Sequence, residues 1–177
     1  KNANHAPNLH YSIQAAENVN FEDHSFDLII VGQAIHWFDF KKFYTEVKRT
    51  SKKETIICAV GYGKLKISPE IDSIIDHFYT EIIGPYWDAE RKYIDEDYKT
   101  IPFPFKEIIS PNFEQSYLWD LDDLIGYLNT WSAVKHFINS KGYNPVDDLK
   151  IELKEIIGNE KIKVRFPIIL RIGYVNL

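Results

Sequence analysis

The sequence is short of sulfur: its 177 residues include no methionine and a single cysteine, where ordinary usage gives roughly three to five methionines. One cysteine cannot form an internal disulfide, and Cys58 lies inside the apolar run Ile56–Val60, so we expect a buried, unreactive thiol. This usage fits a reducing compartment, and we predict a cytoplasmic protein. No apolar run approaches the roughly 18–20 residues that span a bilayer, so no membrane partner is expected.

Motifs for several kinds of chemistry are also missing. There is no HExxH, paired CxxC, P-loop or GxSxG, and the six histidines have no ligand-like spacing, which argues against a metal site and a serine hydrolase. The net charge is −5 with lysine and arginine dispersed, which argues against a nucleic-acid partner. Gly61-x-Gly63 follows a predicted strand, but Lys66 stands at the third glycine position of a dinucleotide fingerprint, so we interpret it as a turn.

The first half of the chain reads as a strand–helix–strand unit. Leu9–Ala15 alternates weakly and suggests a short strand, whereas Phe26–Gly32 is a continuous apolar run typical of a strand buried on both faces. Asp39 can cap the helix that follows, and Thr55–Val60 is the next buried strand. The helix places its apolar residues at one face, namely Phe40, Phe43, Tyr44 and Val47. Together these segments predict a parallel βαβ unit.

The second half is less regular. Ser68-Pro69 predicts a helix start, and we interpret residues 64–105 as an insertion over the end of the sheet. Phe113–Trp119 predicts a strand, and Asp120 is expected to cap one long helix that extends to Trp131.

The end of the chain predicts one more helix and one more strand. Asn144-Pro145 predicts the helix start, and Lys161–Val175 predicts the closing strand. Pro167 implies that this strand lies at an edge or contains a bulge.

The strongest candidate site is the stretch Gly32–Asp39, just past the end of a buried parallel strand, where open α/β sheets bind ligands. Gln33 and His36 offer hydrogen-bonding groups, and Trp37 offers a flat apolar face. The alternative is that Trp37 and its neighbour Phe38 only pack the start of the next helix.

Two stretches of text carry a family resemblance. The segment AAEN followed by SFDLIIVGQAIHWFDFKKFYTEVKR, and later YLNTWSAVKHF at residues 127–137, resemble class I S-adenosylmethionine-dependent methyltransferases of type 11, within them the trans-aconitate methyltransferase-like branch. The resemblance implies an α/β Rossmann-like sheet, S-adenosylmethionine as cofactor and a small-molecule acceptor. A carboxylate is one candidate acceptor.

The resemblance also implies roles for individual residues. Five residues would bind the cofactor: Ala16 and Glu17 would border the adenine, and Gln33, His36 and Trp37 would lie beside the methionine part and the methyl group. Three further residues would face the substrate, which residues 64–105 would cover as a lid: Tyr62, Trp131 and Ser132. His36 is the candidate catalytic base for a hydroxyl or amine acceptor, whereas a carboxylate acceptor needs none.

The sequence departs from the family pattern in two places. The glycine-rich loop and the acidic residue that binds the ribose would precede Lys1, and Lys-Lys-Glu-Thr at 52–55 replaces a Lys-Pro-Gly-Gly turn. We therefore expect residues 1–177 to form one partial methyltransferase domain that lacks the first strands of its sheet, with an exposed sheet edge. A non-catalytic domain and a nicotinamide-dependent oxidoreductase remain alternatives, and the oligomeric state is left open.

Overall fold

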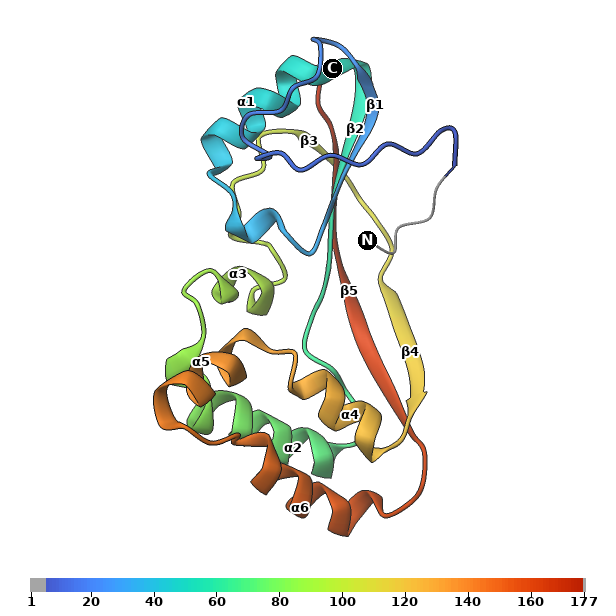
Figure 1. Ribbon diagram of the computed structural model, residues 1–177. Helices are drawn as coiled ribbons and strands as arrows, with labels where there is room; N and C mark the ends of the chain where they lie inside the picture. The colour runs from blue at the N-terminus through green and yellow to red at the C-terminus, as the bar shows by residue number, and fades with distance from the viewer. Residues whose placement is uncertain (1–5, 177) are drawn as a thin grey trace.

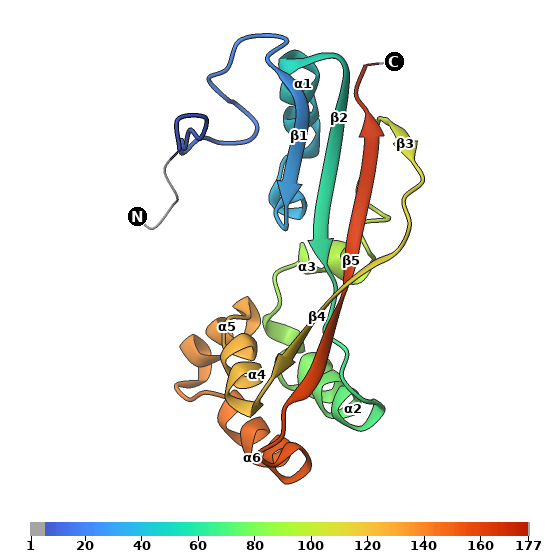
Figure 2. The ribbon, with the colours of Figure 1, turned by 90° about the vertical axis from the view of Figure 1, so that its right-hand side faces the viewer.

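The computed structural model describes residues 6–176, which form a sheet lobe and a helical lobe joined by long strands (Figures 1 and 2). The strands follow the order β1-β2-β5-β3, and β4 also pairs with β5. The strands are β1 (Phe26–Gly32), β2 (Ser51–Tyr62), β3 (Lys106–Ile108), β4 (Phe113–Trp119) and β5 (Ile162–Tyr174). The helices are α1 (Phe40–Thr50), α2 (Pro69–His77), α3 (Arg91–Asp95), α4 (Leu121–Leu128), α5 (Ser132–Lys141) and α6 (Val146–Ile157).

The predicted βαβ unit is confirmed, but the expectation that β1 is buried on both faces is wrong. Ile29 and Val31 pack in the core with α1, whereas Leu28 and Ile30 point to the opposite face and are 52% and 61% exposed. β1 and β2 pair in parallel, and the Asp39 side chain caps α1 by accepting a hydrogen bond from the Lys42 N–H at 3.1 Å. At the start of β2 the register shifts, and Glu54 adopts a left-handed conformation with φ 66°. Glu54 stands where the resembling family has a glycine, the residue that adopts this conformation without steric cost.

The last strand is an interior strand, so its prediction as an edge is wrong. β5 pairs antiparallel with β2 on one side and with β3 and β4 on the other. The carbonyl of Pro167 accepts a hydrogen bond from the Gly63 N–H at 2.9 Å. The N–H that proline lacks falls where β2 has just ended, so no pairing between regular strands is lost.

Two buried clusters form the core, one in each lobe. The helical lobe packs α2, α4, α5 and α6 over the lower half of β5, and the sheet lobe packs α1 over β1 and β2. Residues 64–105 contribute to both clusters: Ile71 and Ile75 lie in the first, and Tyr98 and Ile101 lie in the second. The role of this segment as a lid stays a prediction.

Two expected elements differ from the structure. Leu9–Ala15 is not a strand; Ala15 forms only an isolated bridge to Asn18. The helix expected from Asp120 to Trp131 ends at Leu128, where the Asn129 side chain donates to the Ile125 carbonyl at 2.9 Å, and Trp131 instead precedes the next helix, α5.

The cap of α4 and the surroundings of Cys58 can also be compared with the sequence-based predictions. Asp120 does form the predicted cap, as part of a capping box. Cys58 is half-buried, and burial raises the pKa of its thiol. The helix end expected within residues 1–8 lies mostly outside the described residues. Within residues 6–176, no helix has the length and apolarity needed to cross a bilayer.

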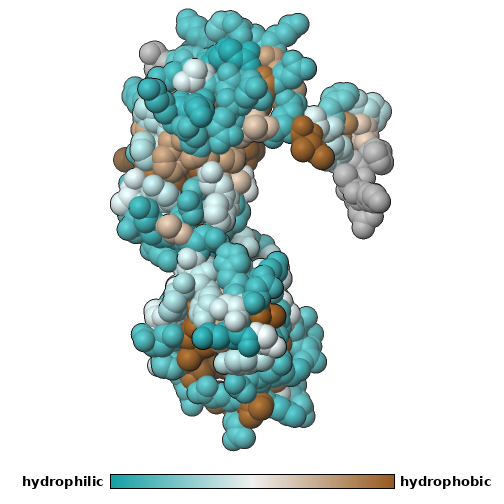
Figure 3. All heavy atoms as spheres, turned by 60° about the vertical axis from the view of Figure 1, so that its left-hand side comes forward, coloured by the Kyte–Doolittle hydropathy of each residue, from teal (hydrophilic) through white to brown (hydrophobic). Residues whose placement is uncertain are grey.

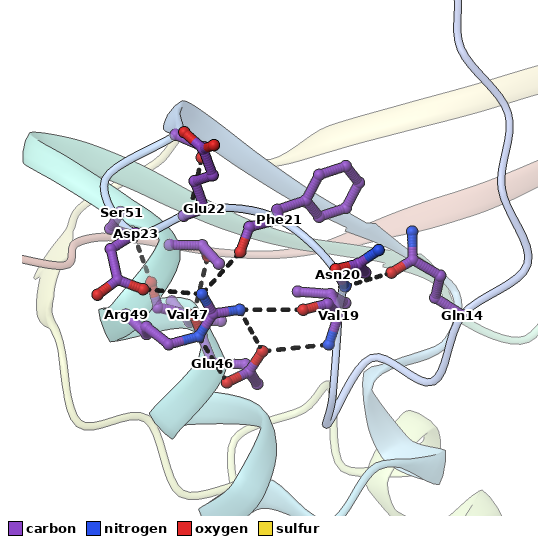
Figure 4. A network of polar contacts seen from close by, with 12 residues as sticks. Gln14, Val19, Asn20, Phe21, Glu22, Asp23, Glu46, Val47, Arg49 and Ser51 are labelled. Carbon is purple, nitrogen blue, oxygen red and sulfur yellow. Dashed lines mark hydrogen bonds and ion pairs between the residues drawn. The ribbon is translucent and has the colours of Figure 1, made fainter.

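The guanidinium of Arg49 ties the loop before β1 to helix α1 (Figure 4). It donates hydrogen bonds to the carbonyl oxygens of Val19 at 3.0 Å and Phe21 at 2.7 Å. It also pairs with Asp23 and Glu46, each at 2.8 Å. The hydrogen bond from Arg49 holds the pKa of the Glu46 carboxyl below its usual range. The Arg49 side chain therefore supplies hydrogen bonds to two backbone carbonyls of this loop and an ion pair to a third residue.

We predict that Arg49→Ala releases this loop. Loss of two carbonyl contacts and two ion pairs should raise the rate of limited proteolysis at the loop by about tenfold or more, because local opening becomes easier. The matched control is Lys48→Ala, which removes the same charge from the adjacent, exposed position of α1. Equal cleavage rates in both variants would contradict the anchoring role.

The same network has a pH dependence. The folded-state pKa of Glu46 is lowered, so its contribution to stability is present above the ordinary carboxyl value and is lost as pH falls through the lowered one. The difference in cleavage rate between wild type and Arg49→Ala should therefore shrink below about pH 4.

Candidate active site

A cavity of about 160 Å³ lies where β1 and β2 end against the helical lobe, near the narrowing between the lobes in Figure 3. It is lined from four parts of the chain: the segment after β1, the end of β2, residues 87–94, and residues 127–132. Six of its lining residues are the predicted site residues Gln33, His36, Trp37, Tyr62, Trp131 and Ser132. The structure thus places residues expected beside the methyl group and beside the substrate around one cavity.

Gln33 joins the ends of β1 and β2. Its backbone is left-handed, with φ 50°, a conformation that costs a non-glycine residue on the order of 1–3 kcal/mol. Its N–H donates to the Val60 carbonyl at 2.7 Å, and its side-chain Oε1 accepts from the Tyr62 N–H at 2.8 Å. These bonds hold the strained turn in place and fix one wall of the cavity.

Gly61 makes room for this arrangement. A Cβ at this position would lie 2.8 Å from Gln33 Oε1 and 2.8 Å from the Tyr98 hydroxyl. Both groups therefore approach the backbone of β2 as closely as only glycine allows. The sequence predicts a turn at Gly61, whereas Gly61 lies within β2.

His36 is buried, with 5% of its surface exposed, and its Nδ1 lies 3.3 Å from the Tyr98 hydroxyl. Burial, with a smaller effect of the Arg91 charge, lowers the pKa of His36, while Glu90 acts in the opposite direction. The ring is therefore neutral at neutral pH. If Tyr98 donates to Nδ1, then Nε2 carries the proton; in the other tautomer Nε2 is a free base.

Tyr98 is a site residue that the sequence argument missed. It is fully buried, has φ 59°, and burial raises its pKa to about 12, so its hydroxyl stays protonated. It lies in the stretch 84–105, whose lack of periodicity gave no signal. Only the folded chain brings it to His36.

Arg91, Asp88 and Ser132 form the polar side of the cavity. Arg91 Nε donates to the Tyr79 hydroxyl at 2.8 Å, and its guanidinium lies 4.7 Å over the Trp87 ring. Arg91 Nε also pairs with Asp95 at 3.4 Å, and within residues 6–176 the two Nη atoms have no hydrogen bond. Asp88 accepts a hydrogen bond from the Ser132 hydroxyl at 3.0 Å. The sequence argument had missed Arg91 and Asp88.

Trp37 lines the candidate site, whereas its neighbour Phe38 packs against the start of α1. Phe38 packs against Phe43 with ring centroids 4.8 Å apart, whereas Trp37 lines the cavity and is 53% exposed overall. Ala16 and Glu17 do not line the cavity. Glu17 instead accepts a hydrogen bond from the Asp39 N–H at 3.0 Å, at the start of α1. Their contact with the adenine stays a prediction.

An α/β sheet with a cavity at the carboxyl ends of parallel strands defines a protein that binds a cofactor or small substrate there. The family described as a methyltransferase domain matches residues 1–59. A "putative methyltransferase" of Dictyostelium discoideum is 33% identical over 176 residues, which cover 95% of this chain and 67% of that protein.

A solved structure is similar over nearly the whole chain. It is titled a "putative type II methyltransferase" from Anaeromyxobacter dehalogenans and superposes with a TM-score of 0.88 at 32% identity, over 98% of this chain and 75% of that one. The chain therefore belongs to this methyltransferase family, and its fold is the expected Rossmann-like α/β fold. It spans two thirds to three quarters of the length of these two relatives.

We predict that Gly61→Ala destabilises the protein by about 1–3 kcal/mol, because the new methyl group must displace Gln33 and Tyr98 from a packed site. Denaturant unfolding measures the change. The matched control is Gly126→Ala in α4, where a Cβ meets nothing within 4 Å and where alanine should stabilise the helix by up to about 1 kcal/mol. Equal effects of the two substitutions would contradict the close approach at Gly61.

We also predict that the His36 ring titrates below its ordinary value of 6.5, as measured by NMR of the ring protons. Arg91→Gln should raise the pKa, because it removes a cation that disfavours the protonated ring. Lys163→Gln, which removes an exposed cation on β5, is the control. A wild-type value at or above 6.5 would mean that water solvates the ring.

Proposed function

We propose that the protein transfers the methyl group of S-adenosylmethionine to a small molecule bound in this cavity. The observation that carries the proposal is that Gln33, His36 and Trp37 meet Tyr62, Trp131 and Ser132 around one cavity. When bound, S-adenosylmethionine supplies a methyl carbon that an acceptor oxygen attacks while the carbon–sulfur bond breaks and its electron pair stays on sulfur.

The residues present fit the reacting end of this cofactor. A cavity of about 160 Å³ is smaller than the roughly 300–1,000 Å³ that encloses a drug-sized ligand, so the rest of the cofactor would lie outside it. The exposed face of Trp37 suits a positively charged sulfonium. Neutral His36 adds no like charge beside it.

The acceptor that this site favours is a small carboxylate. Arg91 lines the cavity with two Nη groups that no described residue occupies, and guanidinium matches carboxylate by paired hydrogen bonds. The sequence resemblance implies a small-molecule acceptor, with a carboxylate among the candidates. Asp88 adds a negative charge to the same cavity, but it accepts a hydrogen bond from Ser132.

His36 has a conditional role. A carboxylate acceptor needs no general base, because placement and exclusion of water can supply roughly 7–11 kcal/mol of the barrier. A hydroxyl or amine acceptor would lose a proton, and neutral His36 is the base that the cavity offers. Turnover of such an acceptor by His36→Ala at the wild-type rate would end that role.

Calorimetric titration of the purified protein tests cofactor binding, and transfer of labelled methyl to small carboxylates tests turnover. We expect binding of S-adenosylmethionine and S-adenosylhomocysteine but not NAD, and an affinity about tenfold weaker in Trp37→Ala through loss of the aromatic face. Phe113→Ala, which removes a half-exposed ring outside the cavity, is the control.

Two outcomes would contradict the proposal. Binding of NAD alone would indicate a nicotinamide-dependent oxidoreductase. Binding of neither cofactor by the folded protein would indicate a non-catalytic domain that keeps the methyltransferase fold.

A further inference from the structure

Beside the cavity lies a second hollow of about 210 Å³, which we call the aromatic cup. Among the described residues, one lining side chain is the amide Gln115, and the other five are aromatic: Tyr62, Tyr117, Trp119, Tyr127 and Phe166. Tyr62 and Tyr127 line the cavity as well as the cup. The two hollows are therefore neighbours that share two lining side chains.

The alternation of β4 builds the cup. Gln115, Tyr117 and Trp119 are two residues apart, so their side chains lie on one face of the strand. Phe166 on β5 stands directly opposite Gln115 in the antiparallel register. Figure 1 shows these two strands beside α4, the helix that contributes Tyr127.

Phe166 forms the floor of the cup. Four rings surround it at 5.2–6.2 Å between centroids, with interplanar angles of 64–82°. Phe166 itself is 4% exposed and belongs to the core, but Tyr62 and Tyr117 remain 39% and 41% exposed. Core packing thus accounts for the floor and leaves the walls partly open. Large open apolar surface of this kind favours a ligand.

The polarity of the two hollows is opposite. The cavity holds the charged side chains of Arg91 and Asp88 together with Ser132, and the cup holds no charged side chain within the described residues. A ligand that fills both must be charged at one end and apolar at the other. The free Nη groups of Arg91 favour a negative charge at the first end.

We propose that the methyl acceptor is a carboxylic acid with a flat apolar tail, whose carboxylate lies at Arg91 and whose tail lies in the aromatic cup. The proposal rests on the proposed function and narrows its substrate class. A cationic tail is the competing occupant of an aromatic hollow, but the cup offers no carboxylate to neutralise it.

The test compares acids that share a carboxylate and have different tails. The probes are 3-phenylpropanoate, tail-less propanoate, trans-aconitate with its polar tail, and 4-(trimethylammonio)butanoate with its cationic tail. We expect kcat/KM to be about tenfold or more higher for the phenyl acid than for propanoate, as burial of a phenyl group would give. A preference for trans-aconitate or for the cationic tail would overturn the proposal.

Variants separate the two ends of the ligand. Arg91→Gln should lower kcat/KM for the phenyl acid and for propanoate by similar factors, since both share the carboxylate. Tyr117→Ser should lower the preference for the phenyl acid about tenfold. Gln115→Trp fills the cup instead of emptying it and should have the same effect. The control is Leu118→Ser on the opposite face of β4, which should keep the preference.

Direct binding keeps this proposal separate from the one on which it rests. Quenching of tryptophan fluorescence measures binding of each acid without turnover, and circular dichroism confirms that each variant is folded. If the acids bind with the expected preference but no methyl is transferred, the proposed function fails and the ligand class stands. If S-adenosylmethionine binds and acids are methylated without regard to the tail, the ligand class fails alone.

Discussion

The site depends on the pairing of β5 with two different partners. The half of β5 near its C-terminal end pairs with β2 in the sheet lobe, and the other half pairs with β4 beside the helices. Phe166 belongs to the core of the helical lobe and Ile169, three residues on, belongs to the core of the sheet lobe. A single continuous strand therefore runs through both lobes and fixes the distance between them (Figure 2). The cavity and the cup both lie near that boundary.

Within this frame, the strain at Gln33 has a structural counterpart in Gly61. A left-handed glutamine persists only where its surroundings outweigh the cost, and here two hydrogen bonds to β2 do so. Those bonds require that β2 present a glycine, because a side chain would occupy the space of Gln33 Oε1. The end of one strand and the middle of the next thus determine each other.

Local pattern predicted the parts of the fold in which one short segment carries its own signal. The strand at Phe26–Gly32, the cap at Asp39 and the strand Phe113–Trp119 were confirmed because apolar periodicity and a capping side chain act over a few residues. The burial of Phe26–Gly32 on both faces was not confirmed, because burial depends on what packs against the strand. The prediction of an edge strand from Pro167 was wrong, because whether a proline disturbs a sheet depends on where the neighbouring strand ends. That position is set by the tertiary structure and cannot be found from the local sequence.

The same limit applies to the residues of the candidate site. Gln33, His36 and Trp37 follow a strand and could be found from the sequence, whereas Tyr98 and Arg91 come from a segment without periodicity. Ala16 and Glu17 were expected from resemblance alone, and the described residues leave them outside the cavity.

The neutral and the charged side chains of the cavity come from different parts of the chain. The sheet contributes neutral groups, since burial keeps His36 unprotonated and Gln33 carries no charge. The helical lobe and the segment before it contribute Asp88 and Arg91. A cationic cofactor at the sheet side and an anionic acceptor at Arg91 would then attract each other across the cavity, with no like charge from the sheet between them. Because the cavity is small and walled by aromatic rings, that attraction is less screened by water than on the open surface, which favours the approach of an acceptor oxygen over that of bulk solvent.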